Sequence, residues 1–398
     1  MGDAARPLLM IPGPIELSPT VVEAFSKPSP GHLAPGLIES FGRSLEMMRE
    51  VWQAGPDAQP FILTGGGTVA MDVVAANLVE PGETAVVINT GYFSDRLAEM
   101  LRRQGAKVVE VAAPAVGDAP ATDVVGRALA SGSVKALFAT HVDTSTGVCI
   151  DPEPLARMAR DRGILSVFDG VCATAGESFR MKEWGADVYL TGSQKALGVP
   201  PGLALLVASP LALEARARRG PNAPPPPMYL DLEQWLPIMK AYEKRRPAYF
   251  STPATNLILA LEAGLGEILE DGIEPRIARH QHAARAMRAA WDALGLRPVP
   301  TRPELRAATL SAVYLPEGID VAAVVGGTAR NGVIVAGGLH PEIRTRYFRV
   351  GHMGYAITRK EMLVRTVDAI GRALRDAGAS ADPARAVCAV ESALDATS

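Results

Sequence analysis

Lys195 stands in a segment whose composition suits a reactive amine. It lies in the run Gly192-Ser193-Gln194-Lys195-Ala196, between two predicted apolar strands, Val188–Thr191 and Ala204–Ala208. Only eight of the 40 basic residues are lysines, so this chain uses arginine for most plain positive charges. A lysine held in a partly buried turn can have a lowered pKa and form a Schiff base with a carbonyl compound. The alternative, a solvated loop lysine, is disfavoured by the apolar strands on either side.

Asp169 ends another predicted apolar strand, Leu165–Asp169. An acidic side chain at the carboxyl end of a parallel strand often faces a ligand crevice. A helix-capping or turn role is the alternative interpretation of the same position. Asp169 is therefore a candidate ligand-binding residue.

A glycine-rich turn, Gly65-Gly66-Gly67-Thr68, joins a predicted strand at Phe61–Thr64 to a predicted helix at Val69–Leu78. The start of a helix has free backbone N–H groups and a positive dipole end, and glycines let an anion approach the backbone. No Gly-Lys-Ser/Thr follows, and the full dinucleotide fingerprint is absent. The turn is therefore either a phosphate site of another kind or an ordinary loop.

These segments belong to a chain in which short apolar strands alternate with helical patterns. Such alternation predicts an α/β fold with a mostly parallel sheet that is covered by helices on both faces. Further predicted strands lie at Ala85–Asn89, Val108–Val111 and Ala136–Thr140, and further predicted helices at Arg96–Gln104 and Pro152–Arg162.

The length of 398 residues favours two domains. After residue 256 the pattern changes to long amphipathic helices with short strands, which is typical of a smaller α+β domain. The Pro-rich stretch 221–227 reads as an exposed loop. We expect an N-terminal segment at residues 1–20, a large domain at 21–255, a small C-terminal domain at 256–378, and a weakly patterned, partly disordered tail at 379–398.

Composition excludes several classes of protein. Hydrophobic residues make up 48% of the chain and the formal charge is −3, which rules out a disordered chain and disfavours a nucleic-acid partner. No run of about 20 apolar residues exists, so we expect no membrane span. Cys149, Cys172 and Cys388 are too far apart to suggest a metal site or a disulfide pattern. With no signal-peptide core at the N-terminus, three free thiols in the cytoplasm are expected.

The glycine turn, Asp169 and the Ser-Gln-Lys-Ala run together resemble the class V branch of pyridoxal-phosphate (PLP) aminotransferases, and within it the alanine–glyoxylate aminotransferases. The resemblance covers nearly the whole chain, and its pieces fall in the family's order and spacing. It implies a fold-type I PLP enzyme that forms a homodimer with shared active sites. The other segments that carry it are Leu9–Pro14, Gly31–Pro35, Thr90–Arg96, His141–Gly147, Tyr249–Pro253 and Arg349–Gly354.

The resemblance also implies roles for the matching residues. Lys195 would bind PLP covalently and move a proton between substrate and cofactor, while Asp169 would pair with the pyridine nitrogen. Gly13 and Arg349 would bind the substrate, with Arg349 holding its carboxylate. The remaining cofactor-binding residues would be Phe93 and Val171 on the two ring faces, Ser145 near the ring hydroxyl, Gly66, Gly67, Thr68 and Gln194 at the phosphate, and Tyr249 and Thr252 from the partner subunit.

The implied reaction converts alanine and glyoxylate into pyruvate and glycine by a ping-pong mechanism, since both half-reactions share one site. Other pairs of a small amino acid and a 2-oxo acid fit the same residues, and serine–glyoxylate or serine–pyruvate transamination is the first alternative. A desulfurase is less well supported, because no cysteine lies in a segment resembling the mobile nucleophile loop of those enzymes. A catalytically silent PLP-fold binding protein is the alternative from another class, and the intact Lys195, Asp169 and Arg349 argue against it.

Overall fold

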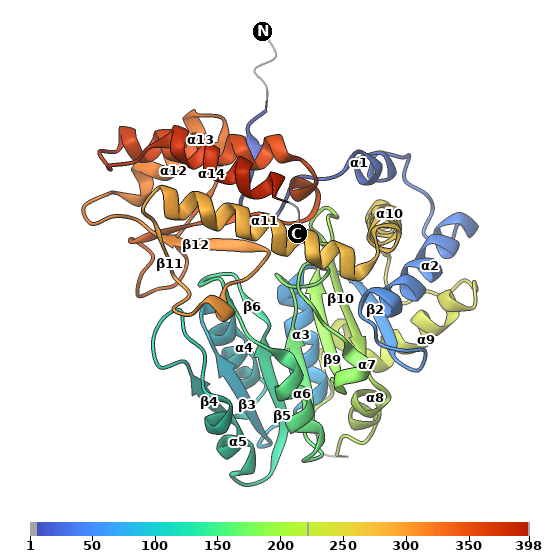
Figure 1. The fold of residues 1–398 in the computed structure, drawn as a ribbon. Helices are drawn as coiled ribbons and strands as arrows, with labels where there is room; N and C mark the ends of the chain where they lie inside the picture. Colours follow the sequence, from blue (N-terminus) through green and yellow to red (C-terminus); the bar gives the residue numbers. More distant parts are fainter. Residues whose placement is uncertain (1–5, 221–222, 397–398) are drawn as a thin grey trace.

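The computed structural model describes residues 6–220 and 223–396 (Figure 1). Residues 1–5, 221–222 and 397–398 lie outside the described residues, so the predicted N-terminal segment, Pro-rich loop and tail are each covered only in part. Within the described ranges, the main sheet has seven strands in the order β2-β10-β9-β8-β5-β3-β4. These strands are β2 (Gln59–Thr64), β3 (Thr84–Asn89), β4 (Lys107–Ala112), β5 (Val134–Thr140), β8 (Leu165–Asp169), β9 (Val188–Gly192) and β10 (Leu203–Ala208).

The main sheet is parallel except at β10. That strand runs antiparallel to both of its neighbours, β2 and β9, whereas β9, β8, β5, β3 and β4 pair in parallel. Because β10 reverses direction between them, β2 points the same way as β9. The carboxyl ends of all the strands except β10 therefore meet at one edge of the sheet, as the alternating sequence pattern predicts.

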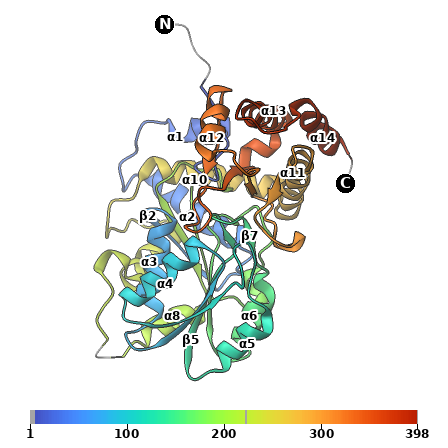
Figure 2. The same cartoon turned by 90° about the vertical axis from the view of Figure 1, so that its left-hand side faces the viewer.

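Helices cover both faces of this sheet. Such cover is needed because every residue of central strands such as β8 and β9 is buried. Figure 2 shows α3 and α4 on one side of the sheet and α5 and α6 on the other. The helices α3, α4 and α5 each follow a strand of the main sheet and pack back onto it, which is the usual connection between parallel strands. The helices around the sheet are α3 (Gly67–Leu78), α4 (Tyr92–Arg103), α5 (Thr122–Ala130), α6 (Pro152–Arg160), α7 (Met181–Trp184) and α8 (Pro210–Ala217).

A second, smaller unit contains an antiparallel sheet with strand order β11-β12-β15-β14. Its helices lie together above the main sheet in Figure 1, where α14 packs on α11 and α13. The first strand of the chain, β1, pairs in parallel with β13 and so joins the N-terminal segment to this unit. The elements are β1 (Leu8–Leu9), β11 (Arg297–Pro298), β12 (Leu310–Tyr314), β13 (Val333–Ile334), β14 (Ala336–Gly337), β15 (Tyr347–Gly351), α11 (Ile273–Ala293), α12 (Val321–Arg330), α13 (Lys360–Asp376) and α14 (Pro383–Asp395).

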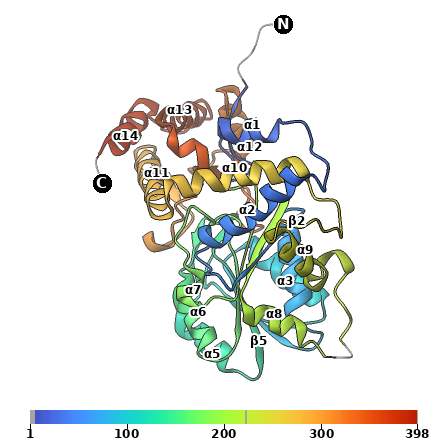
Figure 3. The ribbon, with the colours of Figure 1, turned by 90° about the vertical axis from the view of Figure 1, so that its right-hand side faces the viewer.

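The helix α10 (Thr255–Asp271) connects the two units in sequence. Its buried residues, including Leu261 and Leu265, belong to the core of the larger unit, while buried residues of α11 such as Met287 and Trp291 belong to the core of the smaller one. Figure 3 shows α10 crossing beside α2 (Pro35–Val51), its main packing partner. The expected domain limits at residues 20, 255 and 378 stay a prediction. The remaining elements are α1 (Pro19–Phe25), α9 (Leu232–Glu243), the hairpin β6 (Val142–Asp143) with β7 (Val148–Cys149), and the short 3-10 turns η1 (Met228–Leu230), η2 (Pro303–Leu305) and η3 (Gly354–Thr358).

The expectation of a partly disordered tail is wrong for residues 383–395. These residues form α14, whose first turn is capped by the Asp382 carboxylate accepting from the Arg385 backbone N–H at 3.1 Å. Ala386 and Val390 lie one helical turn apart on one face and are fully buried. The alanines weaken the hydrophobic pattern of the sequence, yet they allow α14 to pack closely against α11 and α13.

The described part of the chain contains no helix with the length and apolar character needed to cross a membrane. Nor does it bring together three or more histidine, cysteine or acidic side chains in a group that could hold a metal ion. Cys149, Cys172 and Cys388 are free thiols, as expected.

Candidate active site

The edge of the main sheet where the parallel strands end carries most of the predicted site residues. β8 ends at Asp169, and the turns after the neighbouring strands bring residues far apart in sequence to the same edge. This is where open α/β sheets bind their ligands. In chain order the edge carries Gly66, Gly67 and Thr68 after β2, Phe93 after β3, Ser145 after β5, Asp169 and Val171 at and after β8, and Gln194 and Lys195 after β9.

Lys195 is a buried amine, with 9% of its surface exposed. Burial is the main cause that lowers its pKa, because the charged form loses hydration, and the nearby Arg349 acts in the same direction. The Lys195 Nζ donates to the carbonyl oxygen of Pro12. The next residue, Gly13, has a φ of +91°, and a Cβ there would lie 2.4 Å from Lys195 Cδ. A glycine is therefore required for the N-terminal segment to pass this close to the lysine.

The Asp169 carboxylate is also buried, with 2% of its surface exposed. It accepts a hydrogen bond from the Val171 backbone N–H at 2.9 Å, so the chain turns sharply after β8. Burial raises the pKa of Asp169 to about 7, and the carboxylate of Asp143 adds to this while Lys195 opposes it. A cation placed beside Asp169 would return its pKa toward the ordinary range for a carboxyl group.

The glycine turn is a bare helix start. α3 begins after Gly66, and no side chain caps its first turn. A Cβ on Gly67 would lie 2.5 Å from Val171 Cγ2, and one on Gly192 would lie 2.8 Å from Gln194 Oε1 and 2.9 Å from the Gly67 nitrogen. Gln194 Oε1 is buried and has no hydrogen-bond partner among the described residues. These contacts place Gln194 and Val171 beside the start of α3, and the uncapped N–H groups of that helix start suit an anion.

Asp143 is a site residue to which the sequence analysis assigned no role. Its Oδ1 accepts from the Ser145 backbone N–H at 2.9 Å and from Ser145 Oγ at 2.6 Å, while its Oδ2 accepts from the Phe93 backbone N–H at 3.1 Å. Ser145 Oγ in turn accepts from the Tyr92 N–H at 3.1 Å. A Cβ on Gly91 would lie 2.6 Å from Ser145 Oγ, so the turn before α4 must be a glycine. Asp143 thus fixes Phe93 and Ser145 relative to each other.

Arg349 reaches the same region from β15 in the smaller unit. Its Nε donates to the Gly337 carbonyl at 2.9 Å and its Nη1 to the Thr144 carbonyl at 3.2 Å. Within the described residues no carboxylate forms an ion pair with it, and burial lowers its pKa. The Tyr347 hydroxyl, on the same strand, donates to the Ser145 carbonyl. The strand β15 is therefore held against the loop that carries Ser145.

Tyr249 and Thr252 lie apart from the residues above within this chain. Tyr249 is 60% exposed, its hydroxyl lies 3.3 Å from Thr252 Oγ1, and its ring lies 5.3 Å from the His32 ring. The segment that follows returns to the sheet, where the Ala254 N–H donates to Thr64 Oγ1 at 3.2 Å. The described residues show no contact of Tyr249 or Thr252 with Lys195, so their predicted role depends on a second subunit.

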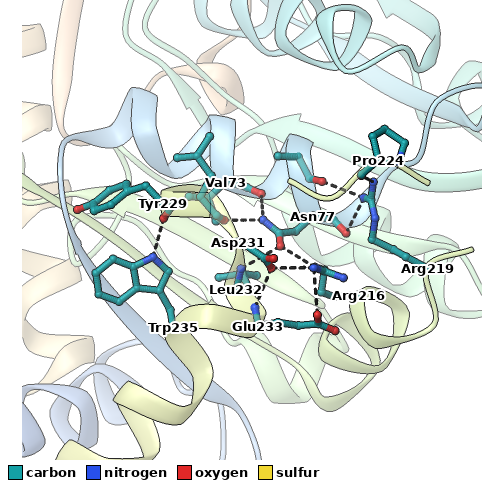
Figure 4. A network of polar contacts seen from close by, with 12 residues as sticks. Val73, Asn77, Arg216, Arg219, Pro224, Tyr229, Asp231, Leu232, Glu233 and Trp235 are labelled. Atoms are coloured by element: carbon teal, nitrogen blue, oxygen red, sulfur yellow. Dashed lines mark hydrogen bonds and ion pairs between the residues drawn. The ribbon is translucent and has the colours of Figure 1, made fainter. Parts of the chain in front are cut away.

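A buried polar network at the far end of α3 anchors the chain that leads to Tyr249 (Figure 4). Asn77 Oδ1 accepts from Arg216 Nε and from the Leu232 backbone N–H, both at 3.0 Å. Arg216 Nη2 also donates to Asp231 Oδ1 at 2.7 Å, and both side chains are less than 10% exposed. Although Arg218 and Arg219 follow it in a basic segment of the sequence, Arg216 is buried and connects α8, α3 and α9.

A large cavity lies away from these residues. Its volume is about 580 Å³, and its lining includes Ala54, Leu165 and Pro210 around the opposite ends of the strands. None of the predicted site residues lines it. The candidate site is therefore defined by its side chains and by the sheet edge, and not by cavity size.

The fold, which holds a buried lysine and a buried strand-end aspartate at one edge of its main sheet, is that of a fold-type I PLP-dependent transferase. The aminotransferase class-V family model matches residues 39–353, and the chain belongs to this family. Its cofactor is accordingly pyridoxal 5′-phosphate.

Three known proteins illustrate the similarity. Alanine–glyoxylate aminotransferase 1 of Saccharomyces cerevisiae is 36% identical over 363 residues, which cover 89% of this chain and 94% of that protein. L-Aspartate–glyoxylate aminotransferase of Paracoccus denitrificans is 32% identical over 87% of this chain and 86% of that protein. The crystal structure of ureidoglycine–glyoxylate aminotransferase from Bacillus subtilis superposes with a TM-score of 0.90 at 27% identity, covering 99% of each chain.

Proposed function

We propose that this protein transfers the amino group of a small amino acid, alanine, to glyoxylate. The three relatives named above act on different amino donors according to their names, but all three names contain glyoxylate. The observation that carries the proposal is the pairing of a buried, pKa-lowered Lys195 amine with the buried Asp169 carboxylate at one sheet edge. This pairing suits amino-group chemistry on PLP.

The residues present fit this cofactor. Asp169 is a buried carboxylate, and burial raises its pKa. A cationic neighbour would stabilise its charged form, and a protonated pyridine nitrogen would be such a neighbour. The uncapped start of α3 fits its phosphate, with Gly66, Gly67 and Thr68 offering backbone or hydroxyl donors and Gln194 offering its amide N–H groups. Phe93 and Val171 would bound the ring, and Ser145 Oγ would lie near the ring hydroxyl. The chemistry that PLP supplies there is an electron sink for the substrate's α-carbon and a carrier for the amino group.

Lys195 would hold and move the proton of the reaction. A neutral amine is needed to take the proton from the substrate's α-carbon, and burial already favours the neutral form. The contact of Lys195 Nζ with the Pro12 carbonyl holds the amine at the edge where the substrate would lie. Gly13 lets the N-terminal segment pass directly beside this amine, since a side chain there would occupy the position of Lys195.

Arg349 would hold the substrate carboxylate. Two of its N–H groups are taken by carbonyls, which fix the guanidinium plane, and the others are left for an anion. Alanine and glyoxylate both carry a carboxylate next to the reacting carbon. One clamp therefore serves both substrates in turn, which is the physical basis for the ping-pong mechanism.

The choice of alanine as donor rests on the Saccharomyces relative, and serine–glyoxylate or serine–pyruvate transamination is the alternative within the same chemistry. One methyl or hydroxyl group changes binding by only about 1–3 kcal/mol. The test offers isotope-labelled glyoxylate with L-alanine, L-serine or L-aspartate and measures labelled glycine by mass spectrometry. We expect L-alanine to give the highest kcat/KM. A higher kcat/KM with another donor would show that alanine is not the preferred amino donor. Absence of labelled glycine with every donor would refute the proposal that the enzyme transfers an amino group to glyoxylate.

We further propose that the enzyme is a homodimer in which Tyr249 and Thr252 serve the partner's phosphate site. Two observations support this proposal. Tyr249 is exposed in the single chain, and the segment that follows it contacts Thr64, directly before the glycine turn. A symmetric dimer makes such an exchange reciprocal.

A further inference from the structure

A small cavity lies beside the loop that carries Ser145, between α11 and the strand β12. Its volume is about 20 Å³, enough for one atom or molecule of the size of water. The lining includes Arg288 and Trp291 from α11, Arg306 from the segment before β12, and Gly147 from the loop that carries Ser145. The residues that line this cavity include no aspartate or glutamate.

Two buried donors on this lining lack a partner. Trp291 Nε1 and Arg306 Nε are both inaccessible to solvent, and no acceptor among the described residues reaches either of them. Trp291 is 2% exposed in total, so its indole N–H cannot turn toward bulk water. Leaving a buried N–H without an acceptor is unfavourable, and more so when the donor is charged.

The charge around the cavity is positive. No carboxylate of the described chain forms an ion pair with Arg288 or Arg306, and each of the two guanidiniums is the other's close cationic neighbour. Arg288 Nη2 donates to the carbonyls of Arg306 and Ala307, both at 2.8 Å, which holds the guanidinium at the cavity wall. Glu177 is the acidic group that interacts electrostatically with Arg288. Burial raises the pKa of Glu177 to about 7. Glu177 therefore compensates this charge only in part at neutral pH.

We propose that this cavity is a binding site for one chloride ion. A monatomic anion matches the small volume. It accepts from both unpartnered donors and balances the arginine charge at once. A water molecule could also accept from the two N–H groups but would leave the charge uncompensated. The ion would join α11 of the smaller unit to the segment at Arg306 and to the turn at Gly147.

The test measures the thermal unfolding midpoint of the PLP-loaded enzyme in sodium gluconate with increasing sodium chloride at constant ionic strength. We expect a saturable rise of about 2 °C in chloride, since ligand binding to the folded state alone stabilises it by mass action. Trp291→Phe and Arg306→Gln should each weaken the apparent chloride affinity about tenfold or more, because each removes a donor to an anion. The matched control is Arg302→Gln, which removes a charge from an exposed arginine nearby and should leave the response unchanged.

Crystals of the wild-type enzyme grown with sodium bromide give a second measurement that does not depend on any variant. We expect an anomalous bromide peak within contact of Trp291 Nε1 and Arg306 Nε. Chloride could also occupy the carboxylate position at Arg349, so a peak found only there would overturn the proposal. A thermal unfolding midpoint that is the same in chloride and in gluconate would likewise overturn the proposal and indicate that the cavity holds water.

Discussion

Lys195 is the residue on which the proposed chemistry depends most directly. Lys195→Ala should leave transamination negligible and remove the visible absorption band of the PLP-loaded protein, because no other amine is held at this sheet edge in the described structure. Borohydride reduction of the wild type, followed by peptide mass spectrometry, should find the adduct on Lys195. Lys182→Ala, at an exposed lysine, is the matched control and should keep full activity. An adduct on any other lysine would refute the assignment.

Asp169 gives a prediction about pH and stability in the absence of PLP. Its pKa is raised from 3.8 to about 7 in the folded chain, so the folded state binds a proton more tightly than the unfolded state. The contribution of Asp169 to stability is therefore most favourable below pH 4 and is lost as the pH rises through about 7. Other buried groups titrate too, so the measurement is the difference between wild type and Asp169→Asn.

We expect the free energy of unfolding of the cofactor-free wild type to fall relative to Asp169→Asn between about pH 4 and pH 7, by a few kcal/mol in all. Urea unfolding at several pH values measures this difference. Loading with PLP should abolish the difference in slope, because a cationic ring beside Asp169 stabilises the charged carboxylate. If the free energy of unfolding changes with pH to the same extent in the two cofactor-free proteins, the pKa of Asp169 is not raised in the folded chain.

Arg349 gives a prediction that separates binding from chemistry. Arg349→Lys should raise the KM for both alanine and glyoxylate about tenfold or more, since lysine keeps the charge but not the two-pronged hydrogen bonding. The kcat should change less, because the proton transfer at Lys195 remains. Steady-state kinetics with each substrate varied in turn make the measurement. Unchanged KM values would mean that another group binds the carboxylate.

At the scale of elements, the network of Asn77, Arg216 and Asp231 joins α3, α8 and α9. Arg216→Gln should destabilise the fold by about 3 kcal/mol, because it leaves the Asp231 carboxylate buried without its partner. Urea unfolding gives the free energy, with Arg218→Gln as the matched control. Arg218 pairs with Glu214 on the helix surface, so its loss should cost less than about 0.5 kcal/mol. Equal effects of the two substitutions would show that the buried pair is not a structural tie.

The elements also show how far the sequence could predict the fold. The central strands were predicted to within about two residues, because strands such as β8 and β9 are short apolar runs bounded by turns. The last helix, α14, was missed because small alanines give little hydrophobic contrast, although they suit close packing. The fold class is confirmed by the family and its solved structures.

The sequence predicts a candidate site residue when the residues next to it form a recognisable pattern. It does not predict one whose role depends on a contact with a distant part of the chain. Lys195 and Asp169 follow apolar strands, and the structure brings them to one sheet edge. The role of Asp143 depends on the Phe93 backbone N–H, fifty residues earlier, which no local pattern indicates. The burial of Arg216 depends equally on the distant Asn77. The roles given to Tyr249, Thr252 and the other cofactor contacts stay a prediction.

At the scale of the whole molecule, shared active sites can be tested with mixed dimers. One inactive chain carries Lys195→Ala and the other carries Tyr249→Ala with Thr252→Ala. In a mixed dimer the chain that keeps Lys195 receives Tyr249 and Thr252 from its partner, so one of its two sites is fully wild type. Random reassortment makes about half of the dimers mixed, so about a quarter of wild-type activity should return.

The mixture is made by co-expression or by refolding, and native mass spectrometry verifies the mixed species. Each variant reassorted with itself is the control and should stay inactive. Recovery no greater than the activity of the separate variants would show that Tyr249 and Thr252 act within their own chain.

The position of β2 at the edge of the main sheet has a consequence for synthesis on the ribosome. This strand pairs only with β10 among the described strands, and the two are separated by about 140 residues of chain. Until Leu203–Ala208 has left the ribosome, β2 has no sheet neighbour and the glycine turn that follows it has no fixed place. While β10 is still inside the ribosome, the nascent chain therefore exposes an unpaired apolar strand, which is a target for chaperones and for aggregation. A pause in translation before residue 203 should lower the yield of folded enzyme more than a pause after the strand is complete.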